Sequence, residues 1–296
     1  MSFSGKIKEE IEQNIPSARH CQVAETAALL INIGQIREVK EGWEIRFPTE
    51  ETPGKRKLFT LLKKTFNISL TLDETVTAED AERVLEAVRY SAAKDKEVSG
   101  LLIKNTCCKR SYIAGLFLAT GSMSNPENGY HLEFVCESKA QAAQTMELLK
   151  DFEVEAKEAE RKGRVVVYIK EADAISELLT VMGAGLSMMD LENVKIVKGI
   201  RNSVNRKVNC DTANINKCLR AADRQIEDIE YLQEHVGFKK LPDSLREMAE
   251  VRLEYPEMAL GELGQMMDPP LGKSGVNHRL RRLSEMAKKH RESREE

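Results

Sequence analysis

The side chains best suited to recognise another molecule lie near the C-terminus, on a segment that repeats with helical spacing. Residues 271–291 contain seven Lys or Arg residues against a single acid, Glu285. At about 100° per residue, an apolar stripe is predicted to face a core: Val276, Leu280, Leu283 and Ala287. Arginine can bond guanine and asparagine can bond adenine through two hydrogen bonds, and a helix start favours phosphate. We therefore predict that this helix contacts duplex DNA through Lys273, Ser274, Asn277, His278, Arg281 and Arg282.

The elements around this segment follow the order of a helix-turn-helix. A helix is predicted from about Pro242 to Glu254, a short helix over 258–266, a break over 268–272 and a last helix over 274–289. A short helix, a tight break and a longer basic helix are typical of the motif. The alternative is a basic helix that packs only on its own bundle. Two lysines further along the last helix are candidate phosphate contacts: Lys288 and Lys289.

A second basic segment precedes a long predicted helix over 214–236. Residues 195–207 contain five Lys or Arg residues and no acid, although the whole chain has a net charge of -3. Two interpretations of residues 201–214 stay open. The segment is a structured linker whose amides cap the long helix, or it is a strip that contacts phosphate, with Arg206 and Lys207 the best candidates.

The cysteines and histidines do not predict a metal site or a catalytic group. The six cysteines form no C-x-x-C pair, and no Cys/His spacing suits zinc. We therefore expect no cofactor, no metal and no catalytic residue, with thiols that are reduced and mostly buried. No apolar run approaches the roughly 20 residues that cross a bilayer, and the N-terminus is unlike a signal peptide. We expect a cytoplasmic, nucleoid-associated protein without a membrane partner.

The first 200 residues predict an α+β domain made of two similar halves. Each half has the order helix, strands, helix, strand, helix, and the halves match when Gly34 is aligned with Gly121. The first half is predicted to contain helices over 19–33, 54–66 and 78–90, with Thr77 as N-cap of the last, and strands over 36–39, 43–47 and 68–72. The second half is predicted to contain helices over 109–120, 139–150 and 171–182, and strands over 131–135 and 164–169.

The helix over 111–122 has small residues on one stripe: Ala114, Gly115 and Ala119. It resembles the LAGLIDADG helix of homing endonucleases, in which two such helices cross tightly and each ends in an acid that binds the catalytic metal. Mg²⁺ needs carboxylate ligands of this kind. The acid positions here correspond to Ile33 and Thr120. Neither residue can bind the metal, so we expect no metal-dependent cleavage at this axis.

Longer segments give the chain a resemblance to the WhiA family of bacterial regulators over its full length. The matching segments are 112–122, 179–185, 202–214 and 271–280. The resemblance implies a degenerate LAGLIDADG-like domain with saddle-shaped antiparallel sheets over 1–200. It further implies a polar linker and long helix over 201–236 and an all-α helix-turn-helix domain over 237–296.

The resemblance also implies a function. WhiA proteins are implicated in transcriptional control of sporulation-associated division, or in cell division and chromosome segregation, and are not known as nucleases. We therefore expect a sequence-specific regulator that binds promoter DNA, whose N-terminal domain adds phosphate contacts or binds a protein partner. The alternative is a division scaffold for which DNA contact is secondary.

Overall fold

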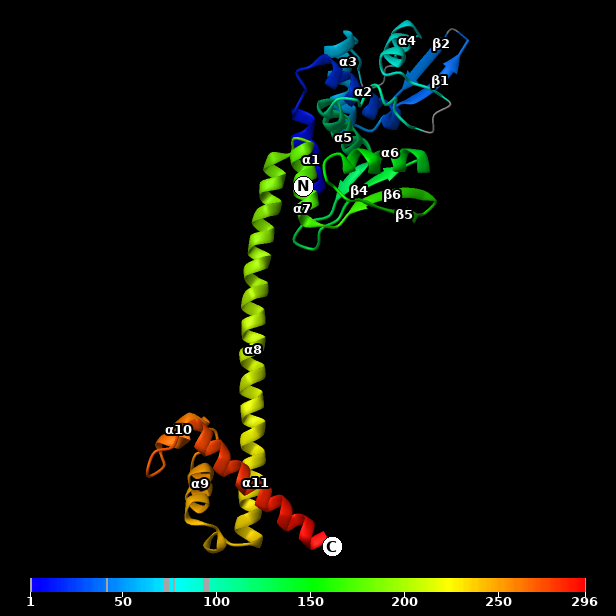
Figure 1. The fold of residues 1–296 in the computed structure, drawn as a ribbon. Coiled ribbons are helices and arrows are strands. Elements are labelled where there is room, and N and C mark those ends of the chain that lie inside the picture. The colour runs from blue at the N-terminus through cyan, green and yellow to red at the C-terminus, as the bar shows by residue number, and fades with distance from the viewer. Residues whose placement is uncertain (1, 41, 72–74, 77, 93–95, 296) are drawn as a thin grey trace. The chain divides into compact units, whose positions relative to one another are not determined.

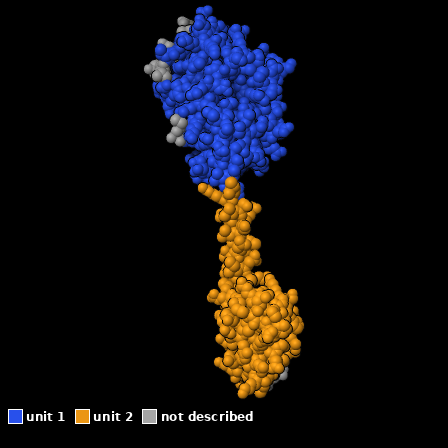
Figure 2. All heavy atoms as spheres, turned by 90° about the vertical axis from the view of Figure 1, so that its left-hand side faces the viewer, with its two compact units in different colours: residues 1–199 blue, residues 200–296 orange. Residues whose placement is uncertain are grey.

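The chain folds into two compact units, each with its own hydrophobic core. The computed structural model describes residues 2–40, 42–71, 75–76, 78–92 and 96–295. Unit 1 is Met1–Gly199 and unit 2 is Ile200–Glu296 (Figures 1 and 2). No helix in the described part of the chain is both long and apolar enough to cross a membrane.

Two packed helices form the centre of unit 1, as the small-residue stripe predicted. They are α2 (Arg19–Ile33) and α5 (Thr106–Thr120), and most of their residues are buried. A Cβ atom on Gly115 would lie 2.9 Å from the backbone oxygen of Glu25 and 3.0 Å from the Cβ of Ala28. Contacts that short are repulsive, so glycine at this position allows the two backbones to approach.

The first half of unit 1 surrounds α2 with a two-stranded sheet and three helices. The strands β1 (Gln35–Val39) and β2 (Gly42–Arg46) pair antiparallel, with Ile36 opposite Ile45. The helices are α1 (Phe3–Gln13), α3 (Pro53–Phe66) and α4 (Ala78–Ala87).

The strand predicted over 68–72 is wrong for residues 68–71, which are irregular. Ile68 is buried in the core, which accounts for the apolar pattern without any strand pairing. Among the residues that the structure describes, the sheet is extended by an isolated bridge between Ile45 and Val76. Thr77, the predicted N-cap of α4, lies outside the described residues.

The second half of unit 1 has a four-stranded antiparallel sheet in the order β3-β4-β6-β5. Its strands are β3 (Gly121–Met123), β4 (Leu132–Cys136), β5 (Lys157–Arg161) and β6 (Arg164–Ile169). Its further helices are α6 (Lys139–Lys150) and α7 (Ala172–Val181). The sequence did not predict β3, which is short, or β5, whose charged residues occupy an edge where charge prevents pairing with other chains.

Unit 2 is all-α. It contains the end of α8 (Gly185–His235), a 3-10 turn (Phe238–Lys240), α9 (Asp243–Glu254), α10 (Leu260–Gln265) and α11 (Lys273–Glu295). Two predicted boundaries are wrong. The long helix begins at Gly185 rather than near 214, so residues 201–214 are helical and not a separate linker. The last helix continues to Glu295 instead of ending near 289.

Candidate nucleic-acid interface

The last helix of unit 2 has one buried face and one exposed face, as the sequence predicted. The four residues of the apolar stripe are at most 1% exposed. They pack with Ile229 of α8, Leu245 of α9 and Leu263 of α10. This packing leaves the opposite face of α11 in solvent. The residues predicted to contact DNA are all exposed: Lys273, Ser274, Asn277, His278, Arg281 and Arg282.

Two neighbouring arginines of α11 have different surroundings. Arg281 is 77% exposed, and its Nε donates to the carboxylate of Glu285 at 3.1 Å. Arg279 instead donates to the backbone oxygen of Ser244 at 3.3 Å and lies 3.8 Å from the carboxylate of Glu247. Both of these partners belong to α9. Arg279 therefore holds α11 against α9, whereas Arg281 belongs to the outward face.

Backbone hydrogen bonds fix the connection between α10 and α11. The N–H of Leu271 donates to the carbonyl oxygen of Gly264 at 2.8 Å, and the N–H of Val276 donates to that of Gly272 at 3.1 Å. A Cβ atom at position 264 would overlap the carbonyl oxygen of Leu271, an approach that only glycine permits. This turn sets where α11 begins and where its first exposed residues point.

The distal end of α11 is anchored to α8. Arg291 donates to the carboxylate of Asp228 at 2.8 Å, and its guanidinium lies 4.4 Å from the centre of the Tyr231 ring. Lys288 and Lys289 are exposed on the same helix, and Lys288 lies 3.7 Å from the carboxylate one helical turn further on. Both lysines remain available as phosphate contacts.

The basic segment 195–207 is part of α8, and its cationic side chains project to different sides of that helix. Residues 201–214 are helical and exposed, so their amides cannot cap the start of a helix, and that interpretation is wrong. At about 100° per residue, Arg206 projects roughly 180° away from the exposed apolar stripe through Val204 and Ile215. Lys207 lies on the flank of that stripe. Arg206 is therefore the better placed of the two for a polar partner.

In unit 1, α2 and α5 end at equivalent residues, Ile33 and Thr120. Ile33 packs against the core. The hydroxyl of Thr120 donates to the carbonyl oxygen of Leu116 at 3.2 Å. Neither side chain carries a carboxylate, which is the ligand that a hard cation such as Mg²⁺ prefers.

Comparison with known proteins accounts for both units. A family model described as the WhiA C-terminal HTH domain matches residues 204–287, and one described as the WhiA LAGLIDADG-like domain matches residues 109–201. A curated relative, "Probable cell division protein WhiA" from Lachnoclostridium phytofermentans, is 44% identical, with 97% of this chain and 98% of the relative covered. The chain belongs to the WhiA family.

Other WhiA proteins agree with this membership. The relative of the same name from Heliobacterium modesticaldum is 41% identical, with 97% of this chain and 96% of the relative covered. The crystal structure of full-length DUF199/WhiA from Thermatoga maritima is 27% identical with a TM-score of 0.59, and the match covers 98% of this chain and 99% of that one. The predicted family and the predicted fold class, a LAGLIDADG-like α+β domain followed by a helix-turn-helix, are confirmed.

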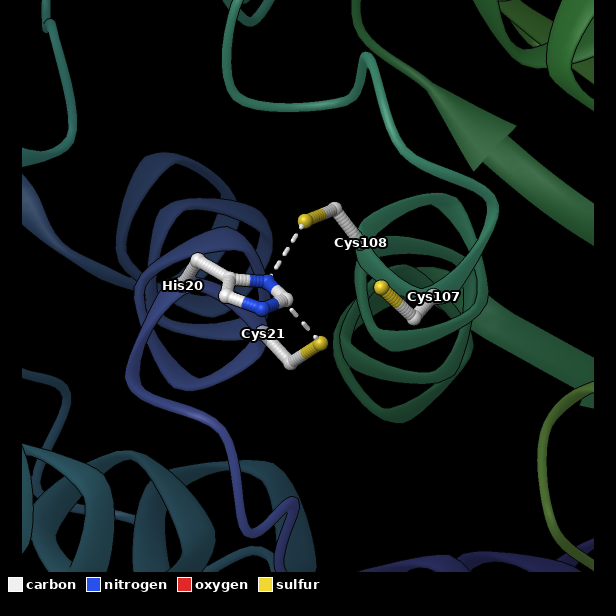
Figure 3. Close-up of side chains that lie close together, drawn as sticks. All are labelled: His20, Cys21, Cys107 and Cys108. Atoms are coloured by element: carbon white, nitrogen blue, oxygen red, sulfur yellow. Dashed lines mark hydrogen bonds between the residues drawn. The ribbon is translucent and has the colours of Figure 1, made fainter.

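One group of side chains in this WhiA-family chain was missed from sequence. His20, Cys21, Cys107 and Cys108 converge at the first turns of α2 and α5, and their ligand atoms all lie within 4.8 Å of one another (Figure 3). No local spacing predicted this group, because two adjacent pairs that are far apart in sequence are brought together by helix packing. The expectation that the protein binds no metal stays a prediction. Three of the free cysteines are exposed rather than buried: Cys107, Cys210 and Cys218.

Proposed function

We propose that this protein is a sequence-specific DNA-binding transcriptional regulator. It acts at promoter regions in the nucleoid, in the cytoplasm, and its process is cell division, chromosome segregation or sporulation. The exposed face of α11 carries the proposal, because it presents hydrogen-bonding and cationic side chains. The apolar residues of the opposite face are buried in the core of unit 2. The names of the curated relatives, cell division proteins, support the proposed process.

The proposed contacts differ along α11. Lys273 and Ser274 are at the helix start, where backbone N–H groups and the helix dipole favour a phosphate oxygen. Asn277 follows one turn later and has the geometry to bond adenine in the major groove. Arg281 and Arg282 come one turn beyond and suit guanine. A recognition helix enters the groove with its N-terminal residues leading, which is the end where these residues lie.

Further lysines and arginines would add affinity without sequence preference. Contacts with phosphate fix the position of a protein on the duplex, and base contacts provide specificity. The candidates for phosphate are exposed on α8 and on the distal part of α11: Arg206, Lys207, Lys288 and Lys289.

We also propose that unit 1 does not cleave DNA, because Ile33 and Thr120 stand at the positions of the two metal-binding acids. Unit 1 would instead contact phosphates or bind a protein partner. The test is incubation of the full chain with supercoiled plasmid and Mg²⁺ or Mn²⁺. No linear product is expected. Metal-dependent cleavage that follows the protein peak through gel filtration would overturn this part of the proposal.

A division scaffold is the second candidate function. The observation in its favour is the apolar stripe on α8 within unit 2, where Ile200, Val204 and Ile215 are each more than half exposed. Apolar surface of this kind often marks a protein contact. In a scaffold, loss of DNA binding would leave the cellular function intact.

The deciding experiment starts from sheared genomic DNA, from which the full-length protein selects its own fragments. An enriched duplex and a scrambled duplex are then compared by fluorescence anisotropy. Arg281→Ala or Arg282→Ala should weaken specific binding by about 1–3 kcal/mol, roughly 5- to 150-fold. Arg246→Ala is the matched control, because Arg246 is bound to Asp243 at 2.7 Å on α9.

The same variants placed in cells separate the two functions. Loss of normal division together with loss of specific binding supports the regulator. Normal division in cells whose protein no longer binds the selected duplex would establish the scaffold instead. Unchanged affinity in both arginine variants would show that the exposed face of α11 does not recognise the DNA sequence.

A further inference from the structure

We propose that His20, Cys21, Cys107 and Cys108 form a binding site for a thiophilic divalent cation, with Zn²⁺ as the natural fit. The Nδ1 atom of His20 lies 3.2 Å from the sulfur of Cys108 and 3.3 Å from that of Cys21. Zinc bonds of about 2.1 Å to nitrogen and 2.3 Å to sulfur in a tetrahedron place ligand atoms about 3.6–3.8 Å apart. The Nδ1 atom of His20 is therefore a few tenths of an ångström closer to these two sulfurs than zinc would hold them, and all the ligand atoms of the four side chains lie within 4.8 Å of one another.

The two halves of unit 1 supply the four ligands symmetrically, two from α2 and two from α5. The alignment that matches Gly34 to Gly121 also matches His20 to Cys107 and Cys21 to Cys108. In each helix the two ligands are the second and third residues, since α2 begins at Arg19 and α5 at Thr106. Figure 3 shows one pair on each helix, facing the other across the gap. Because α2 and α5 are locked together along their length, both pairs are held in place.

The site is reachable from solvent. Cys21 and Cys108 are buried, whereas His20 and Cys107 are exposed. Three of the four residues, His20, Cys21 and Cys107, line a cavity of about 490 Å³. Three thiolates and a neutral imidazole would leave a zinc complex with one net negative charge, and Arg110 is a cationic residue that lines the same cavity.

The ligand set indicates a structural rather than a catalytic ion. Four protein ligands complete a tetrahedron and leave no position for water or substrate, and sulfur with imidazole selects zinc over magnesium. The site is at the N-terminal ends of α2 and α5, whereas Ile33 and Thr120 are at the opposite ends, about 20 Å away at 1.5 Å per residue. The cation would clamp the two central helices together, independently of DNA contact.

The test uses the reduced full-length protein, stripped of metal with a chelator. Addition of Co²⁺ should give one equivalent of binding, with the strong visible bands of tetrahedral cobalt and a near-ultraviolet thiolate charge-transfer band. Zn²⁺ should bleach both signals and raise the unfolding temperature. Cys107→Ser, at an exposed position, should lower zinc affinity by more than the roughly 10- to 100-fold that loss of a supporting partner costs.

The matched controls are Cys210→Ser and Cys218→Ser, which replace exposed cysteines of α8 and should leave the spectra unchanged. Circular dichroism establishes that each variant is folded. The proposal is overturned if the reduced protein gives only octahedral cobalt spectra, or if Cys107→Ser binds zinc as tightly as the parent. It is also overturned if replacement of the α8 cysteines abolishes cation binding. A disulfide that forms among Cys21, Cys107 and Cys108 in the presence of excess zinc would overturn it as well.

Discussion

The amide of Leu271 donates to the carbonyl oxygen of Gly264 at 2.8 Å, and the carbonyl oxygen of Leu271 fills the space that a side chain at position 264 would need. This contact joins α10 to the segment that leads into α11. Leu263 and Val276, on either side of it, are both fully buried. The orientation of the exposed face of α11, which we propose to contact DNA, therefore depends on Gly264, a residue outside that face.

Gly264→Ala should destabilise unit 2 and weaken DNA binding together. The added methyl group has no free space, and overpacking of this kind costs about 1–3 kcal/mol. Denaturant unfolding of the full chain, followed by binding to the selected duplex, measures both effects. The matched control is Gly261→Ala in the same helix, where a Cβ atom meets nothing within 4 Å. Equal stability of the two variants would contradict this account of the turn.

The helices were predictable where packing follows the helical period. The apolar stripe of α11 and the small residues of α5 are both consequences of one face being buried, so their positions appear directly in the sequence. The failures have the opposite cause. Residues 68–71 have an apolar pattern but no strand partner, and β5 is a charged edge strand that lacks the pattern. Pairing between strands depends on tertiary contacts that a local pattern does not record.

The candidate sites also divide into one that the sequence predicted and one that it did not. The exposure of Asn277 and Arg282 followed from the position of the buried stripe, which is a property of one helix. The group around His20 and Cys107 did not, because its members come from two helices and no local spacing joins them. A signal existed in the repeat itself, since the alignment of Gly34 with Gly121 places the two pairs at equivalent positions.

Glu285→Ala should strengthen DNA binding. Glu285 accepts a hydrogen bond from Arg281 at 3.1 Å on the exposed face, so it competes with DNA for the guanidinium and repels phosphate. Exposed pairs of this kind stabilise a helix by only about 0.3–0.5 kcal/mol, so the fold should tolerate the change. Anisotropy at low and high salt provides the measurement. Glu292→Ala removes the acid near Lys288 and serves as control, with a smaller effect. Weaker binding by Glu285→Ala would mean that the pair positions Arg281 for reading.

Arg206 and Lys207 should differ in their effect on salt dependence. Each phosphate contact adds about 0.9 to the slope of log affinity against log salt concentration. Arg206 projects from the polar side of α8, so Arg206→Ala should lower the slope by about 1 for every duplex tested, whether selected or scrambled. Lys207→Ala is the matched comparison and should lower the slope by less, because Lys207 lies on the flank of the exposed apolar stripe. A change in sequence preference for either variant would argue against phosphate contact.

Glu25 and Lys57 form a buried ion pair in the centre of unit 1. Each side chain is 1% exposed, and the Nζ atom of Lys57 lies 2.5 Å from a carboxylate oxygen of Glu25. The same ammonium donates to the backbone oxygens of Ile11 at 2.6 Å and Asn14 at 2.9 Å. The second oxygen of Glu25 has no hydrogen-bond partner among the described residues. Burial consequently raises the pKa of Glu25 to about 7, although Lys57 acts to lower it.

Glu25→Gln should therefore gain stability relative to the parent as the pH rises. A carboxyl group whose pKa is raised on folding contributes stability below its unfolded pKa and loses it as the pH rises through the folded value. The window here extends from about 4.5 to about 7. Thermal unfolding of parent and variant is measured across this range with a chelator present, so that cation binding adds no pH dependence of its own. The difference in unfolding temperature, parent minus variant, should fall steadily and level off above the window. A difference that grows with pH would mean that the attraction of Lys57 outweighs burial and that the pair stabilises the fold as an ion pair.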